Sequence, residues 1–140
     1  TQGAVIMVSS ALPNEGKTTV ALSLARAYAL SGERVLVLDC DLRRPGIHKH
    51  LNVEGSTGLV DVVAGNVTHR NLSRVLVNDP KTTLTSIVGA RHVNLPTDQL
   101  VASKSLNQII AAARQNFDYV VIDSPPLVGR VQLSTFLILS

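Results

Sequence analysis

The sequence predicts an α/β fold built on parallel strands, and three observations predict it. Apolar runs at residues 4–8, 35–38 and 120–122 have the length and composition of strands that are buried on both faces. Segments with helical character separate these runs. The second and third runs each end at an aspartate, Asp39 or Asp123, as a parallel strand does where it emerges at its carboxyl edge. Ligands of open α/β sheets bind at that edge, so the fold class also predicts where a site should lie.

The first strand is expected at residues 4–9. The segment that follows this strand has the layout of a phosphate-binding P-loop. A turn follows the strand and leads into a helix expected over residues 18–31, which Gly32 ends. The usual spacing is Gly-x-x-x-x-Gly-Lys-Ser/Thr, and Ala11 stands here in place of the first glycine. The second half of the pattern is intact, so the layout still predicts a phosphate site.

Backbone N–H groups at the start of a helix have no intrahelical partner and bind anions. Lys17 adds a positive charge for the β- and γ-phosphates, and the Thr18 hydroxyl is a suitable ligand for Mg²⁺. The expected nucleotide-binding residues are Ala11, Leu12, Pro13, Asn14, Glu15, Gly16, Lys17, Thr18 and Thr19.

The second strand is expected at residues 35–39 and completes a βαβ unit with a right-handed crossover. Asp39 and Asp41 follow it two residues apart, so they share a face while the chain stays extended. Two carboxylates beside a phosphate site are costly unless a cation lies between them. The third run ends at Asp123 in the form of a Walker B strand, whose aspartate holds Mg²⁺ directly or through water.

The middle of the chain carries weaker signals. We expect a loop over residues 42–57, a short helix over 58–65, and short strands at 72–77 and 84–88 around an Asn78-Asp79-Pro80 turn. Thr97 and Ser103 are candidate helix N-caps. An amphipathic helix that ends before Phe117 is indicated by Leu106, Ile109, Ile110 and Ala113.

Composition and charge limit the classes of protein to which this chain can belong. The chain has 140 residues, 45% of them hydrophobic and 16% charged, which predicts one globular domain over residues 1–140. Its single cysteine, Cys40, excludes an internal disulfide. The net charge of +3 is partly due to Arg43 and Arg44, which form either a solvated loop or a surface for phosphate, an acidic partner or anionic lipid. No aromatic residues interleave with the basic ones, so nucleic-acid binding is not expected. Both ends of the sequence suggest a domain cut from a longer chain.

Three motifs together resemble a known family. Residues 9–19, 36–45 and 120–126 resemble the Walker A, Walker A′ and Walker B motifs of bacterial tyrosine kinases, the P-loop kinases of capsule and exopolysaccharide synthesis. Residues 58–65 and 95–100 resemble connecting segments of that family. The resemblance implies a P-loop NTPase-type fold, a doubly wound, mainly parallel sheet with helices on both faces. It also implies transfer of the ATP γ-phosphoryl group to tyrosine, including tyrosines on another copy.

The resemblance implies a role for each matching residue. Lys17, Asp39 and Asp41 would be catalytic, with either aspartate as the base, and Thr18, Asp39 and Asp123 would hold the metal. The implied cofactors are ATP and Mg²⁺. The implied partners are a membrane chain-length regulator, fused or separate, and a protein that carries the acceptor tyrosine. A homo-oligomer and a cytoplasmic location at the inner face of the plasma membrane are also implied.

Some residues depart from the family pattern. The only tyrosines, Tyr28 and Tyr119, lie in expected core elements, so this chain has no tyrosine-rich tail to modify.

The main alternative is an ATPase switch of the partition and septum-placement type, but those proteins carry an early P-loop lysine where this chain has Leu12. A catalytically silent ATP-sensing module is the other alternative.

Overall fold

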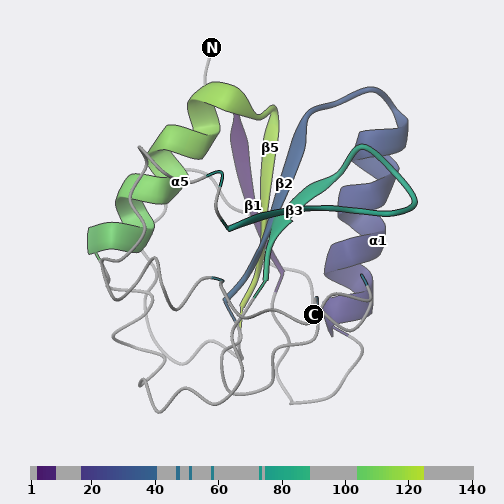
Figure 1. Ribbon diagram of the computed structural model, residues 1–140, viewed down its shortest axis with the longest axis horizontal. Coiled ribbons are helices and arrows are strands. Elements are labelled where there is room, and N and C mark those ends of the chain that lie inside the picture. The colour runs from purple at the N-terminus through teal and green to yellow at the C-terminus, as the bar shows by residue number, and fades with distance from the viewer. Residues whose placement is uncertain are drawn as a thin grey trace.

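The computed structural model describes residues 3–8, 17–40, 47, 51, 58, 73, 75–88 and 104–124. Within these residues a mixed sheet lies between helices α1 and α5, which cover its opposite faces (Figure 1). The elements are β1 (Ala4–Val8), α1 (Lys17–Leu30), β2 (Val35–Asp39), β3 (Leu76–Asn78), β4 (Thr85–Ile87), α5 (Lys104–Asn116) and β5 (Tyr119–Asp123).

The sheet has the strand order β1-β5-β2-β4-β3. The β1–β5, β5–β2 and β2–β4 pairs are parallel, and only the β3–β4 pair of this described sheet is antiparallel. The expected α/β fold of the P-loop NTPase type is confirmed, since the sheet is mainly parallel and helices flank both of its faces. Because β5 lies between β1 and β2, the carboxyl ends of these three strands meet at one edge.

The core forms two clusters, one on each face of the sheet. Along β2, Leu36 and Leu38 pack on the α5 side, whereas Val35 and Val37 pack on the α1 side, as the alternation of a strand requires. The near-continuous apolar runs of the sequence therefore reflect a sheet that is covered twice. The helices contribute Leu106, Ile109, Ile110 and Ala113 from α5, and Ala21, Leu22, Ala25 and Ala29 from α1.

Helix α1 ends as the sequence predicts. Gly32 has φ of 90° and donates its N–H to the Ala29 carbonyl at 3.0 Å, while Glu33 N donates to Tyr28 O at 3.1 Å. These two bonds form a Schellman motif, which satisfies carbonyls that the end of a helix leaves unpaired. No helix among the described residues has both the length and the apolar character to cross a bilayer.

Two expectations for the middle of the chain need correction. Asn78 lies in β3, paired with Thr85, and not in the turn, because Asp79 begins the turn with its N–H bonded to Leu84 O at 2.9 Å. Ile47, in the expected loop, is helical, and its carbonyl accepts the N–H of Leu51 at 3.1 Å. The expected helix after Gly58 and the candidate N-caps Thr97 and Ser103 lie outside the described residues.

Candidate functional site

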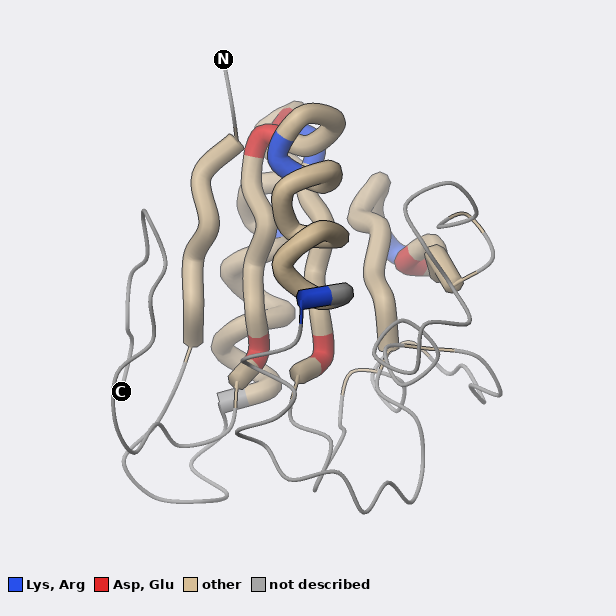
Figure 2. The backbone as a smooth tube through the Cα atoms, turned by 90° about the vertical axis from the view of Figure 1, so that its left-hand side faces the viewer, with Lys and Arg blue, Asp and Glu red and all other residues tan. Residues whose placement is uncertain are grey.

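The fold brings the two strand-end aspartates together. Asp39 ends β2 and Asp123 ends β5, and the two residues are direct partners in the parallel register. Figure 2 shows neighbouring strands that end in acidic residues at the same edge of the sheet. Both residues are completely buried. Adjacent strands lie about 4.8 Å apart, so the two carboxylates repel each other unless a cation or a donor compensates their charge.

The start of α1 reaches the same edge. The Thr18 hydroxyl donates to Asp123 Oδ2 at 2.9 Å, although 105 residues separate the two in sequence. Thr18 follows the first residue of α1, whose first turn carries no acidic residue. The positive end of the helix dipole and the helix's leading N–H groups therefore lie beside the buried carboxylates.

Not every predicted site residue can be placed. The backbone of Lys17 opens α1, and Thr19 is exposed on that helix's first turn. The side chain of Lys17, residues 11–16 and Asp41 lie outside the described residues. The structure thus brings Thr18, Asp39 and Asp123 together.

Backbone contacts tie the strand ends to one another. Cys40 N donates to Asp123 O at 2.9 Å, and Ser124 N donates to Val8 O at 3.0 Å. The buried Ser124 hydroxyl also donates to Val8 O, at 3.3 Å. Sequence reasoning marks Ser124 only as the residue after Asp123, because hydrogen bonds to a backbone carbonyl leave no signature in the sequence.

The described donors suit a hard cation. Thr18 offers a hydroxyl, and Asp39 and Asp123 offer carboxylates, the oxygen ligands that Mg²⁺ takes in proteins while it keeps several waters. Among the described residues, no group of three or more His, Cys, Asp or Glu side chains is arranged to hold a metal ion.

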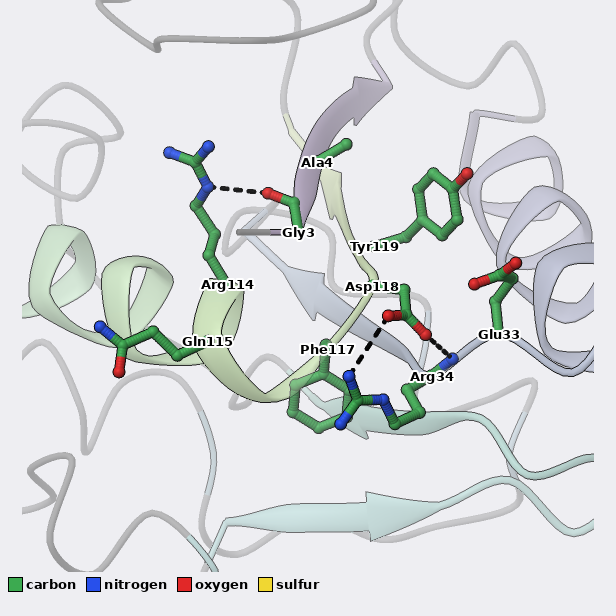
Figure 3. Close-up of a pocket in the computed structure, with 9 residues that line it drawn as sticks. All are labelled: Gly3, Ala4, Glu33, Arg34, Arg114, Gln115, Phe117, Asp118 and Tyr119. Atoms are coloured by element: carbon green, nitrogen blue, oxygen red, sulfur yellow. Dashed lines mark hydrogen bonds and ion pairs between the residues drawn. The ribbon is translucent and has the colours of Figure 1, made fainter. Parts of the chain in front are cut away.

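A separate pocket lies at the opposite edge of the sheet, beside the amino ends of β1 and β5 (Figure 3). It encloses about 290 Å³. Arg34, Asp118 and Arg114, which line this pocket, already have partners within the protein. Arg34 contacts Asp118 at 3.3 Å, and Arg114 Nε donates to Gly3 O at 2.8 Å. The hydrogen bond from the Arg34 backbone N–H has the largest effect on the pKa of Asp118, which it lowers. The hydrogen bond from the Arg34 guanidinium lowers this pKa further. We therefore place no chemistry in this pocket.

Comparison with known proteins supports this picture. The sequence matches the family described as AAA domain over residues 3–139. The succinoglycan biosynthesis transport protein ExoP of Rhizobium meliloti (strain 1021) is 36% identical over 134 residues, which are 94% of this chain and 17% of ExoP. Further curated relatives are named tyrosine-protein kinase. The chain is thus much shorter than the curated proteins that it first matches.

Two solved structures share the fold. The kinase domain of Escherichia coli tyrosine kinase ETK has a TM-score of 0.79 and 30% identity, with 89% of this chain and 47% of that one covered. The cell division ATPase MinD of Pyrococcus furiosus has a TM-score of 0.74 and 25% identity, with 91% and 52% covered. The resemblance to bacterial tyrosine kinases is confirmed, and the chain belongs to the AAA domain family.

Proposed function

We propose that this chain is the ATP-binding and phosphoryl-transferring domain of a protein tyrosine kinase that regulates capsular or exopolysaccharide synthesis and chain length. The hydrogen bond from Thr18 to Asp123 is the observation that carries the proposal. It joins the start of the helix that follows the P-loop pattern to the aspartate of the Walker B pattern. That junction is what a magnesium-nucleotide site requires.

Residues 11–19 would bind the nucleotide phosphates, with the leading N–H groups of α1 and the Lys17 ammonium as the donors. Thr18, Asp39 and Asp123 would hold Mg²⁺. When bound, Mg²⁺ supplies positive charge that stabilises the transferred phosphoryl group. The protein's contribution is mainly to fix these groups before the reaction, which lowers the entropic part of the barrier.

A carboxylate beside the phosphates would accept the proton of the incoming tyrosyl hydroxyl. Asp39 and Asp41 are the candidates, and Asp39 lies at the described edge of the sheet. Lys17, Asp39 and Asp41 are thus the proposed catalytic residues. A general base must lie within hydrogen-bond reach of the proton that it removes. Asp39 is the last residue of β2, and Asp41 follows it two residues later in the sequence.

The acceptor tyrosine should belong to another protein or another copy. Tyr28 and Tyr119 stack on each other with ring centroids 4.1 Å apart, and both are half-buried. We propose a membrane chain-length regulator as partner, fused or separate, a location at the inner face of the plasma membrane, and a homo-oligomer in the full-length protein. The much greater length of ExoP is consistent with a fused partner.

The likeness to MinD keeps a second function in view, an ATPase switch. Leu12 stands where that class carries a lysine, which favours the kinase. A third possibility is a silent module that binds ATP without turnover.

Transfer of label from γ-labelled ATP to a Glu/Tyr copolymer separates these functions. A kinase labels the copolymer, an ATPase switch releases free phosphate only, and a silent module does neither. We expect Lys17→Met to lower the labelling rate at least a hundredfold, on the order of 3 kcal/mol of transition-state stabilisation. Ser23→Ala, on the exposed side of α1, is the control. Labelling by Lys17→Met at the wild-type rate would contradict the proposed role of Lys17.

A further inference from the structure

Ser124, the residue after β5, is a buried polar side chain that the proposed metal site does not use. It is only 1% exposed, so its hydroxyl is not open to a ligand. The backbone N–H of Ser124 donates to the carbonyl of Val8, at the end of β1, at 3.0 Å, and the hydroxyl donates to the same carbonyl at 3.3 Å. A carbonyl oxygen has two lone pairs, so it can accept both bonds. The hydroxyl therefore adds a second connection where the β1–β5 ladder ends.

These bonds lie beside Asp123, the aspartate of the Walker B pattern. Asp123 pairs with Val8 in the register of the sheet, and its carbonyl accepts the Cys40 N–H from the end of β2 at 2.9 Å. Its carboxylate accepts the Thr18 hydroxyl of α1 at 2.9 Å. Three neighbouring elements are thus connected to the last residue of β5 and to Ser124, and the Ser124 hydroxyl strengthens the connection to β1.

The hydroxyl bond acts at a strand end, where fewer ladder bonds hold the chain and local opening costs less free energy than in the middle of a sheet. Loss of one ordinary hydrogen bond changes such an opening equilibrium about fivefold. Ser124→Ala should still fold, because the backbone N–H continues to satisfy the Val8 carbonyl and no buried acceptor is left unpaired. Should it not fold, Ser124→Cys keeps a side chain of similar size with only a weak donor.

We propose that Ser124 is a positioning residue, whose hydroxyl fixes the end of β5 against β1 and so places the Asp123 carboxylate beside Thr18 for magnesium. The proposal rests on the proposed function for its metal and nucleotide, and on the Ser124–Val8 contact for its geometry. Mg²⁺ requires nearly ideal octahedral geometry, so a small shift of one carboxylate weakens its binding. Binding of a nucleotide without metal makes no such demand on Asp123.

The chain offers a matched control in Ser86 of β4. Ser86 is also completely buried, and its hydroxyl donates to the Val77 carbonyl of the neighbouring strand β3 at 3.3 Å. Ser86→Ala therefore makes the same chemical change to the same kind of bond, in a strand pair that carries neither carboxylate of the site. The two Ser→Ala variants should lose similar stability, so a difference between them at the site reports on position and not on stability.

Amide hydrogen exchange in the full chain tests the connection without nucleotide or metal. The Cys40 N–H reports on the end of β5, and the Asp79 N–H reports on the β3–β4 hairpin. Rates are taken relative to the Val121 N–H in the middle of the sheet, so that a global loss of stability cancels. Ser124→Ala should speed exchange at Cys40 about fivefold and leave Asp79 within about twofold of wild type, and Ser86→Ala should do the reverse. Unchanged relative exchange at Cys40 in Ser124→Ala, or an equal change there in Ser86→Ala, overturns the connection.

Calorimetric titration tests the consequence for the site. Ser124→Ala should weaken binding of Mg²⁺–ATP about fivefold and leave binding of metal-free ATP within about twofold of wild type, whereas Ser86→Ala should match wild type with both. Ser124→Thr keeps the hydroxyl and should restore the affinity. Wild-type affinity of Ser124→Ala for Mg²⁺–ATP overturns the positioning role, as does a threonine variant as weak as the alanine variant. A wild-type chain that binds no Mg²⁺–ATP would refute the proposed function, while the exchange experiment would still decide the connection.

Discussion

At the scale of single residues, Asp79 shows how the protein stabilises a charge away from the site. Its side chain is completely buried, just after β3, and receives two bonds from Arg26 of α1, at 3.0 and 2.9 Å. The Thr82 hydroxyl donates to it at 2.6 Å. Burial raises the pKa of Asp79, but the hydrogen bonds from Arg26, Thr82 and the Lys81 N–H outweigh it, so the pKa lies below its ordinary value.

Removal of the cation from this pair should destabilise the fold. We expect Arg26→Ala to lower the free energy of unfolding by about 2–3 kcal/mol, because it leaves the Asp79 carboxylate buried without its partner. Urea denaturation measures this change. Arg34→Ala, at the solvent-exposed pair with Asp118, is the control and should change stability very little. Equal effects from both substitutions would show that the Arg26–Asp79 pair is not special.

The same carboxylate predicts a pH dependence. The pKa of Asp79 is lower in the folded than in the unfolded chain, so its stabilisation is fully present above the unfolded value, about 3.9, and is lost as pH falls through the folded value. The difference in unfolding free energy between wild type and Asp79→Asn should therefore shrink between pH 6 and pH 3. Urea titrations at both pH values measure it. A difference that is the same at both would contradict the lowered pKa.

At the scale of elements, the end of α1 depends on the backbone of one residue. Gly32 has φ of 90°, and a Cβ placed there would meet no atom within 4 Å. The cost of a side chain at this position is therefore conformational and not steric. We expect Gly32→Ala to lower the free energy of unfolding by about 1 kcal/mol, and Gly32→Asn by less, because asparagine tolerates this conformation. Thermal melts of both variants measure the difference, and a neutral Gly32→Ala would contradict the requirement.

Elements with uniform surroundings could be predicted from the sequence. Strands β1, β2 and β5 are apolar except at the Asp that ends β2 and the Asp that ends β5, because both faces of the sheet are covered. Helix α5 shows a clear helical period because only one of its faces packs on the sheet. The hairpin was placed less well, since the position of its turn depends on bonds to the Asp79 side chain. The helical conformation of Ile47 was not predicted, because the carboxylate that accepts its N–H lies eight residues earlier, in β2.

Some residues of the candidate site could be predicted from the sequence, and others could not. The motif order alone placed Thr18, Asp39 and Asp123 at one edge, because parallel strands present their carboxyl ends together. Ser124 and Ile47 were missed, since each contributes a backbone group or bonds to one, and a backbone contact leaves no sequence signature.

At the scale of the whole molecule, the buried carboxylates of the candidate site and the exposed ion pair lie at opposite edges of the sheet. The carboxyl edge gathers buried carboxylates and the start of α1, whereas the amino edge holds the Arg34–Asp118 pair and the pocket beside Gly3 (Figures 2 and 3). A Cβ on Gly3 would collide with the Phe117 carbonyl, so the chain is closely packed at the amino edge as well. A side chain at Gly3 should therefore lower stability without changing metal-dependent nucleotide binding.

The central claim is that the Thr18 hydroxyl and the two buried carboxylates form a magnesium-nucleotide site, and calorimetric titration of ATP with and without Mg²⁺ tests it most directly. We predict that Thr18→Ala weakens binding of Mg²⁺–ATP about tenfold and leaves binding of metal-free ATP nearly unchanged, because it removes one oxygen ligand. Thr18→Ser should restore the affinity, and Ser23→Ala should match wild type. Equal affinity of wild type and Thr18→Ala for Mg²⁺–ATP would contradict the account.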